Sequence, residues 1–218
     1  MKCTLLGSSG LVGSYTLKEL SAREEISEII CPVREIQRTV PAPKAKIIPI
    51  DFSNLKLYKD CFCTDAVICC LGSTRKKAGN TKARALVDLH LPLTCAAIAK
   101  EAGVKHFLVV SAQGANSKSW IPYNKTKGLL EDGLSFLNFE SLTIARPSLI
   151  AGERKEKRFF EKLLLNLFLK VPPPAFFRPV FASSVAKALV ESVLEPPKKK
   201  RILYNRVLTL FDTYRNKI

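Results

Sequence analysis

Histidine and long apolar runs are scarce in this sequence. Its 218 residues include only two histidines, His90 and His106, so a histidine-rich metal centre is not expected and no metal site is predicted. The most apolar stretch, residues 159–171, contains four charged or amide side chains and is too short to cross a bilayer. No secretory leader is expected, because only a few apolar residues separate Lys2 from the first glycine. We therefore predict a cytoplasmic protein.

Paired cysteine motifs are also absent. The chain has seven cysteines but no C-x-x-C pair. Cys3, Cys31, Cys69 and Cys70 fall in apolar runs that we expect to be buried strands. Buried cysteine behaves as a small apolar residue, and structural disulfides are rare in the cytosol. We therefore expect reduced thiols in the core of an intracellular protein.

Acidic residues are in the minority, with 19 Asp and Glu against 35 Lys and Arg, which gives a formal net charge of +16. A field of this sign attracts anions, whether a phosphorylated cofactor, a nucleic acid or an acidic membrane surface. The sequence carries no helix-turn-helix, zinc-finger or base-stacking motif. Specific binding of nucleic acid is therefore not expected.

What the sequence does have is a regular alternation of apolar runs and helical patterns, which is typical of an α/β fold with a doubly wound parallel sheet. A single domain over residues 1–218 is expected, with residues 151–218 contributing a small substrate-side subdomain. A helix is predicted over residues 81–102, bent at Pro92 and ended by Gly103. Strands are predicted at residues 3–6, 28–33, 46–50, 66–70, 106–110 and 141–145.

The stretch GSSGLVG at residues 7–13 lies between the first predicted strand and the first predicted helix. Gly7 permits a tight turn, Gly10 lets backbone N–H groups approach a pyrophosphate, and Gly13 lets the helix pack close to the sheet. The positive end of the helix dipole then faces the phosphates. This pattern predicts a dinucleotide site; the alternative is an ordinary turn of small residues.

Two further segments fall at carboxyl ends of predicted strands. Arg34 comes 21 residues after Gly13, at the distance where NADP-binding folds accept a basic residue for the 2′-phosphate. Arg34 therefore favours NADP(H) over NAD(H), with a solvated arginine as the alternative. Leu71 and Gly72 follow a central strand, beside the crevice where open parallel sheets bind their ligands.

The pattern that points to chemistry combines Ser111, at the end of a predicted strand, with Tyr123 and Lys127. Tyr123 and Lys127 are four residues apart, so they share one face of a helix. A free tyrosine has a pKa of about 10, and an adjacent ammonium lowers it towards working pH. Tyr123 could then protonate a carbonyl oxygen as a hydride arrives, with the Ser111 hydroxyl bonding the same oxygen.

Together these motifs resemble the short-chain dehydrogenase/reductase superfamily, and more closely its atypical branch around the Tat-interacting proteins. The resemblance implies a Rossmann-like fold that binds NADPH, with Tyr123 as proton donor, Lys127 orienting the ribose and Ser111 assisting. The matching segments are GSSGLVG, CCLGSTRKKAG at 69–79, KHFLVVSAQGA at 105–115, Tyr123 to Lys127, and Arg146-Pro147. The residues expected to line the cofactor by the same resemblance are Ser9, Gly10, Leu11, Val12, Arg34, Leu71, Gly72, Ile150 and Arg158.

The chain departs from the family pattern in two places. Glu35 stands where relatives often have a second arginine, which weakens the assignment of NADP. Asp88 occupies the place in the central helix where many members have an asparagine, which puts a proton relay through that position in doubt.

The last third of the chain is expected to form the substrate side. Apolar residues recur at helical spacing between Phe160 and Val171, and such a stripe forms core or pocket lining, with a peripheral membrane contact as the lesser alternative. Its phenylalanines and leucines indicate an apolar substrate. Ser183 or Ser184 is predicted to cap a helix ending near Leu194. Residues 196–201 are predicted to form an exposed loop.

Two functions follow from these observations. The first is an NADP(H)-dependent oxidoreductase that transfers hydride between nicotinamide and a carbonyl or alcohol substrate. The second is an NADPH-binding regulatory or assembly protein with little or no turnover, which would act through a protein partner.

Overall fold

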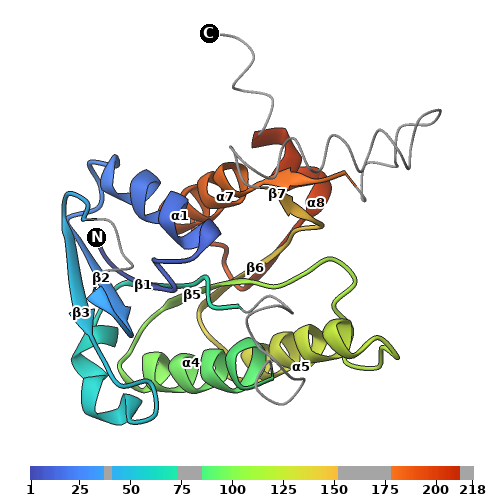
Figure 1. The fold of residues 1–218 in the computed structure, drawn as a ribbon, viewed down its shortest axis with the longest axis horizontal. Coiled ribbons are helices and arrows are strands. Elements are labelled where there is room, and N and C mark those ends of the chain that lie inside the picture. Colours follow the sequence, from blue (N-terminus) through green and yellow to red (C-terminus); the bar gives the residue numbers. More distant parts are fainter. Residues whose placement is uncertain (37–40, 73–84, 152–177, 212–218) are drawn as a thin grey trace, which may run out of the picture.

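The computed structural model describes residues 1–36, 41–72, 85–151 and 178–211. A parallel sheet of seven strands runs through these residues, in the order β3-β2-β1-β4-β5-β6-β9, with helices on both faces (Figure 1). This confirms the predicted doubly wound α/β fold. The strands are β1 (Lys2–Leu6), β2 (Glu28–Val33), β3 (Ala45–Pro49), β4 (Ala66–Cys69), β5 (His106–Val110), β6 (Ser141–Arg146) and β9 (Lys200–Tyr204).

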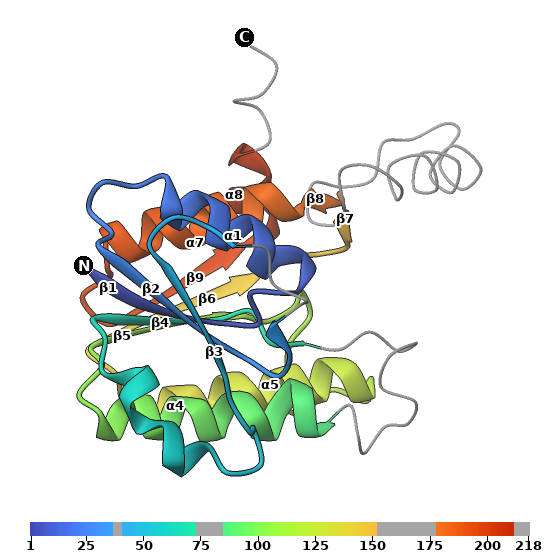
Figure 2. The same ribbon diagram turned by 60° about the vertical axis from the view of Figure 1, so that its left-hand side comes forward.

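Central strands are largely apolar because helices cover both faces of the sheet. In β4, Ala66 and Ile68 face one core while Val67 and Cys69 face the other. One layer of helices packs on the first core and a second layer on the other, as Figures 1 and 2 show. The first layer holds α1 (Leu11–Ser21), α7 (Ala182–Leu194) and α8 (Asn205–Leu208), and the second holds η2 (Leu55–Phe62), η3 (Leu86–His90), α4 (Leu91–Glu101) and α5 (Pro122–Phe136).

The cysteines predicted for the strands lie in these cores. Cys3, Cys31 and Cys69 are buried and Cys70 is half-buried, and all seven cysteines are free thiols. Burial raises the pKa of the Cys3 thiol to about 12 and that of Cys31 to about 11. These thiols therefore stay protonated and unreactive, as expected of apolar packing groups.

The predicted helix over residues 81–102 differs from the structure near Pro92. A wide π-helical turn, η3, precedes α4, and Pro92 sits in the first turn of α4. Proline lacks an N–H and its ring crowds the carbonyl four residues earlier, which here belongs to Asp88. The wider turn accommodates that crowding. The predicted stop is confirmed, since α4 ends at Glu101 and Gly103 has a φ of +82°.

Two predictions for the C-terminal part need correction. The predicted loop 196–201 is confirmed for residues 196–199, whereas Lys200 and Arg201 belong to β9, which pairs in parallel with β6. Ser183 and Ser184 do not cap α7, which begins at Ala182 after Phe181. Phe181 closes strand β8 (Val180–Phe181), paired with β7 (Ile150–Ala151). The chain therefore passes from strand directly into helix, and both serines lie inside the first turn of α7.

Candidate nucleotide and catalytic site

All strands of the large sheet are parallel, so the segments that follow them gather at one edge. These segments include residues 7–13 after β1, Arg34 after β2, Leu71 and Gly72 after β4, and Ser111 after β5. Open parallel sheets bind their ligands at this edge. The sheet therefore places the predicted site residues that follow β1, β2, β4 and β5 at the same edge.

The turn between β1 and α1 needs its glycines. Gly7 has a φ of +81°, and a Cβ atom there would lie 2.8 Å from the Cys70 carbonyl oxygen. A Cβ on Gly13 would lie 2.0 Å from the Gly7 carbonyl oxygen. The Gly10 N–H donates to the Gly7 carbonyl across 2.9 Å. The turn thus packs closely against both α1 and the segment leading to Leu71. The tight turn at Gly7 agrees with the prediction, whereas the contact with Cys70 was not predicted.

The amino end of α1 is open to an anion. Its N-cap is Gly10, which has no side chain to bond the first helical N–H groups. Ser9, Gly10 and Leu11 are exposed, whereas the Val12 side chain is buried in the core. Val12 can therefore contact a ligand only through its backbone. This geometry fits the pyrophosphate of a dinucleotide, because uncapped N–H groups and the helix dipole both favour negative charge.

The structure places the other predicted cofactor residues that it describes after β2, after β4 and on β7. Arg34 and its neighbour Glu35 are exposed just past the end of β2. Leu71 is half-buried and Gly72 exposed after β4, and Ile150 is half-buried on β7. Arg158 lies outside the described residues.

Ser111 and Lys127 meet at the end of β5. Lys127 is buried on α5, and its Nζ donates to the carbonyl oxygen of Val110 across 3.2 Å. Ser111, the next residue, is also buried, and its N–H donates to the Ala145 carbonyl of the adjacent chain segment across 2.8 Å. Tyr123 is half-buried one turn before Lys127 on the same helix. A helix places residues four apart on one face, so Tyr123 faces the same strand end.

Two glycines hold α5 against the segment that follows Ser111. A Cβ on Gly128 would lie 2.0 Å from the Ser117 backbone nitrogen. Gly114 has a φ of +79°, and a Cβ there would lie 2.8 Å from Asn124 Nδ2. The Asn116 N–H also donates to the Asn124 carbonyl across 3.0 Å. The Ser111 segment and the start of α5 therefore form one tightly packed unit.

Sequence reasoning missed the partners of Ser111. The Ser111 Oγ donates to Glu131 Oε1 across 2.5 Å, and Arg146 at the end of β6 binds both oxygens of the same carboxylate, with Nε at 3.0 and 3.2 Å. The bonded carboxylate raises the pKa of Arg146. The spacing of Tyr123, Lys127 and Glu131, each four residues from the next, could have indicated that all three share one face of the helix.

Asp88 is buried on η3 and faces the same region. Its Oδ1 would lie 3.5 Å from a Cβ placed on Gly72. A carboxyl group therefore borders the end of β4, at the position where the family resemblance led us to expect an asparagine in many members.

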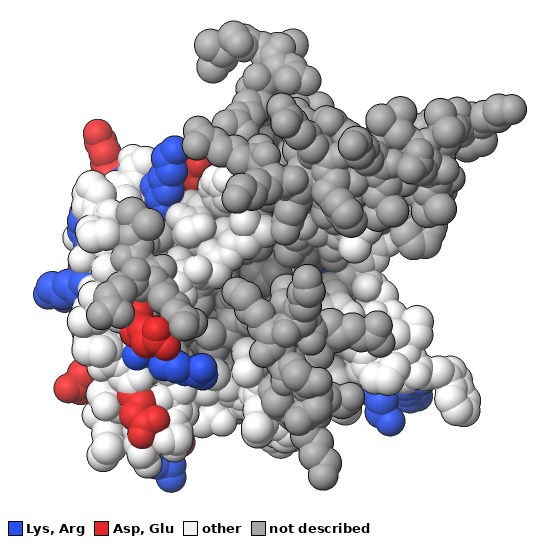
Figure 3. Space-filling model, viewed as in Figure 1, with Lys and Arg blue, Asp and Glu red and all other residues white. Residues whose placement is uncertain are grey.

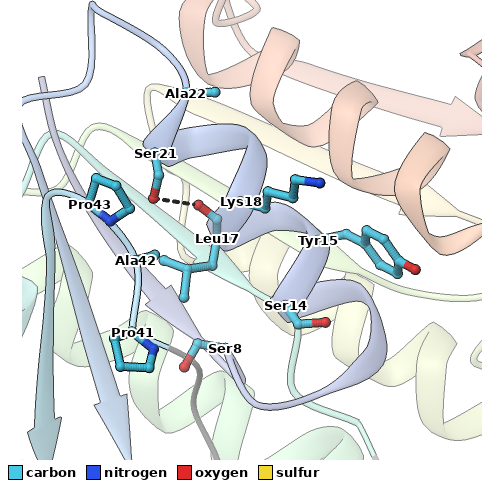
Figure 4. Close-up of a pocket in the computed structure, with 10 residues that line it drawn as sticks. All are labelled: Ser8, Ser14, Tyr15, Leu17, Lys18, Ser21, Ala22, Pro41, Ala42 and Pro43. Atoms are coloured by element: carbon cyan, nitrogen blue, oxygen red, sulfur yellow. Dashed lines mark hydrogen bonds between the residues drawn. The ribbon is translucent and has the colours of Figure 1, made fainter.

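A pocket of about 470 Å³ lies elsewhere, between α1 and residues 41–43 (Figure 4). Its lining is mostly apolar, and it touches the glycine-rich turn only through Ser8. The Leu17 side chain points into the space between α1 and Ala42 (Figure 4). The pocket includes neither Ser111 nor Tyr123, so it is distinct from the proposed catalytic residues.

No helix among the described residues is long and apolar enough to span a bilayer. In those residues no three His, Cys, Asp or Glu side chains are grouped so that they could hold a metal ion.

Comparison with known proteins gives consistent results. A family model described as NAD(P)H-binding matches residues 7–135. The chain is 35% identical over 206 residues to "Protein FMP52, mitochondrial" of Meyerozyma guilliermondii, covering 91% of this chain and 88% of the relative. It is 31% identical over 196 residues to "Protein HTATIP2" of Rattus norvegicus, covering 88% and 81%. These matches confirm the family resemblance found in the motifs.

Solved structures share the fold. The Bordetella bronchiseptica enzyme WbmH in complex with NAD⁺ superimposes with a TM-score of 0.71 at 16% identity, over 99% of this chain and 80% of WbmH. The oxidoreductase ylbE from Lactococcus lactis gives a TM-score of 0.68 at 20% identity, over 96% of both chains. These likenesses confirm the Rossmann-like architecture.

Proposed function

This chain belongs to the NAD(P)H-binding family, in the atypical branch of the short-chain dehydrogenase/reductase superfamily, and on that premise we propose that it is an NADP(H)-dependent oxidoreductase. The reaction would move hydride between nicotinamide and a carbonyl or alcohol substrate. The observation that carries the proposal is the buried Lys127 ammonium at the Val110 carbonyl, directly beside Ser111 and one helical turn from Tyr123.

The proposed binding residues are those of the glycine-rich turn. The uncapped N–H groups at the start of α1 would hold the pyrophosphate, with Ser9 and Gly10 nearest to it. Leu71, Gly72 and Ile150 would line the path along the sheet edge, and Lys127 would bond the ribose. When bound, the dinucleotide supplies or accepts the hydride.

The proposed proton transfer runs through Tyr123. In reduction, the Tyr123 hydroxyl would give its proton to the carbonyl oxygen of the substrate, and in oxidation the phenolate would take it back. The Lys127 ammonium would favour the phenolate, because an adjacent positive charge stabilises the charged form. Ser111 would contact the same substrate oxygen. The phenylalanines and leucines of residues 159–177 favour a substrate with an apolar body.

The preference for NADP(H) rests on Arg34. Its exposed position just after β2 is where a guanidinium could pair with a 2′-phosphate. Exposed Glu35 acts against that preference by adding negative charge beside it. The structural neighbours WbmH and MoeE5 are complexes with NAD, so the two nucleotides have to be compared directly.

A second candidate function is a nucleotide-binding regulator with little turnover, acting through a protein partner. Its supporting observation is exposed aromatic surface at both ends of α5, where Trp120 is 99% and Phe136 90% exposed.

The location is a prediction too: we propose the cytoplasm, while several fungal relatives carry "mitochondrial" in their names. Cell fractionation with antibodies against the protein would distinguish the two compartments.

The test of the enzyme proposal is Tyr123→Phe. We expect this variant to lower kcat for NADPH-dependent carbonyl reduction by about 100-fold or more, because general acid catalysis is lost, while NADPH affinity stays within a factor of about two. Tyr58→Phe, on the outlying η2, is the matched control and should react like wild type. A working substrate reduced equally fast by Tyr123→Phe would contradict the mechanism. Partner capture that depends on NADPH, without turnover of any carbonyl tested, would favour the regulator.

A further inference from the structure

The hydroxyl hydrogen of Ser111 is already engaged within the protein. The Ser111 Oγ lies 2.5 Å from Glu131 Oε1, the distance of a charge-assisted O–H···O⁻ bond. An ionised carboxylate can only accept, so Ser111 is the donor in this pair. A serine hydroxyl has one hydrogen and two lone pairs. What Ser111 has left for a substrate is therefore its lone pairs.

Arg146 fixes the carboxylate in place. Its guanidinium approaches both oxygens of Glu131 edge-on, with Nε at 3.0 Å from one and Nη2 at 2.5 Å from the other. The Arg146 guanidinium also lies over the Tyr204 ring, 5.7 Å from its centre, which is a favourable cation–π contact. Only 4% of the Glu131 side chain and 22% of the Arg146 side chain are exposed. The pair is thus formed largely away from water and holds one geometry.

The backbone of Ser111 is held independently of its side chain. The N–H of Ser111 bonds the Ala145 carbonyl, and Lys127 bonds the carbonyl of the preceding residue, Val110. The Ser111 backbone therefore stays in place whatever its hydroxyl does. The bond to the Glu131 carboxylate then sets both the side-chain rotamer of Ser111 and the direction of its hydroxyl hydrogen.

We propose that Glu131, held by Arg146, is a positioning residue that turns the lone pairs of Ser111 towards the substrate. This rests on the oxidoreductase proposal. While Tyr123 is protonated, a bound alcohol accepts a hydrogen bond from Tyr123 and donates its own hydroxyl hydrogen to Ser111; that hydrogen turns to Tyr123 only when the phenolate forms and the alcohol is oxidised. A carbonyl oxygen, which has no hydrogen to donate, receives its hydrogen bond from Tyr123 alone. The usual expectation, in which Ser111 donates to the carbonyl oxygen, is reversed by its buried partner. The site therefore binds the alcohol form of a substrate more tightly than the carbonyl form.

Glu131→Gln tests this with a minimal change. The glutamine oxygen can still accept from Arg146, while its amide N–H₂ can donate to Ser111. The Ser111 hydrogen is then free to point at the substrate. We expect the KM of the alcohol to rise about tenfold and that of the matching carbonyl to fall several-fold, with NADPH affinity unchanged. In a Ser111→Ala background, adding Glu131→Gln should no longer change either KM.

A second readout needs no turnover. Proton NMR of the full-length protein labelled at serine should show a slowly exchanging, downfield hydroxyl resonance for Ser111, absent in Ser111→Ala and shifted upfield in Glu131→Gln. If Glu131→Gln fails to fold, the wild-type spectrum still tests whether the Ser111 hydroxyl is bonded to Glu131, because a hydroxyl directed at solvent exchanges too fast to be seen.

Two results would overturn the proposal: no such resonance in the wild type, or KM values for alcohol and carbonyl that change together in Glu131→Gln. Failure of the oxidoreductase proposal is recognised separately, because it removes turnover and leaves the hydroxyl resonance intact.

Discussion

At the scale of single residues, the buried charged side chains of the site each have hydrogen-bond or ion-pair partners. Lys127 is 3% exposed yet bonded to the Val110 carbonyl, and Glu131 is 3% exposed yet paired with Arg146 and Ser111. Buried polar groups without partners destabilise a fold, so such contacts are normally made. These partners were invisible in the sequence, because residues 111, 131 and 146 are brought together only by the sheet.

His106 is a buried residue with an incomplete set of partners. Its Nε2 lies 3.0 Å from Thr143 Oγ1, while its Nδ1 has no hydrogen-bond partner among the residues that the structure describes. Burial, with a smaller effect of the Arg201 charge, lowers the pKa of His106 from 6.5 to about 4. The folded protein therefore keeps this imidazole neutral at pH values where the unfolded chain protonates it.

This predicts an acid-sensitive stability. The unfolded state takes up the proton first, so the free energy of unfolding should fall by about 2–3 kcal/mol as the pH drops from about 6.5 towards 4. Urea unfolding at neutral pH and at about pH 4.5 measures the fall. In His106→Gln this part of the fall should disappear, whereas His90→Gln, at an exposed position, should behave like wild type. An equal fall in all three proteins would show that His106 plays no part.

At the scale of elements, the strands of the sheet interior were the most predictable part of the chain. β1, β4 and β5 are buried on both faces, so their sequences are mostly apolar runs, interrupted in β1 by Thr4 and preceded in β5 by His106. β9 was missed because it is an edge strand next to β6, with Leu203 buried but Lys200 and Tyr204 exposed. Its charged start resembles a solvated loop. The two-residue strands β7 and β8 are too short to leave a pattern.

Helix α5 offers a direct test of how tightly the site is built, because two of its glycines have different surroundings. A Cβ on Gly128 meets the backbone of Asn116 and Ser117 within 2.2 Å, while a Cβ on Gly133 meets only the end of the Leu93 side chain, at 2.8 Å. Gly128→Ala must push α5 away from the Ser111 segment. We expect it to destabilise the protein by about 3 kcal/mol.

Gly133→Ala is the matched control in the same helix. Leu93 can change rotamer, and alanine favours helix over glycine by about 1 kcal/mol, so the free energy of unfolding should stay within about 1 kcal/mol of wild type. Thermal or urea unfolding of both variants makes the comparison. If Gly128→Ala were as stable as Gly133→Ala, the close packing of α5 on residues 116–117 would be refuted.

At the scale of the whole molecule, the charge of +16 is unevenly distributed along the sequence. Residues 73–84 and 152–177 together hold eleven Lys and Arg against three Asp and Glu, and both stretches lie outside the described residues. Over the described part of the face in Figure 3, basic and acidic side chains are scattered rather than gathered in one field.

The central claim is that a dinucleotide pyrophosphate binds at the amino end of α1. Two substitutions of Gly10 that differ in charge but hardly in size can test it. Asp and Asn both serve well at the N-cap of a helix, and both would place a Cβ 3.2 Å from the Gly7 carbonyl oxygen. Gly10→Asp and Gly10→Asn should therefore fold alike. Only the aspartate adds a negative charge that repels the phosphates.

The most direct measurement is isothermal titration calorimetry of the wild type, Gly10→Asn and Gly10→Asp with NADPH and with NADH. We predict saturable binding to the wild type, tighter for NADPH than for NADH. Binding to Gly10→Asp should be weaker than to Gly10→Asn by more than about tenfold, or about 1.4 kcal/mol. Absence of heat from both nucleotides with the wild type, or equal affinities of the aspartate and asparagine variants, would contradict the account.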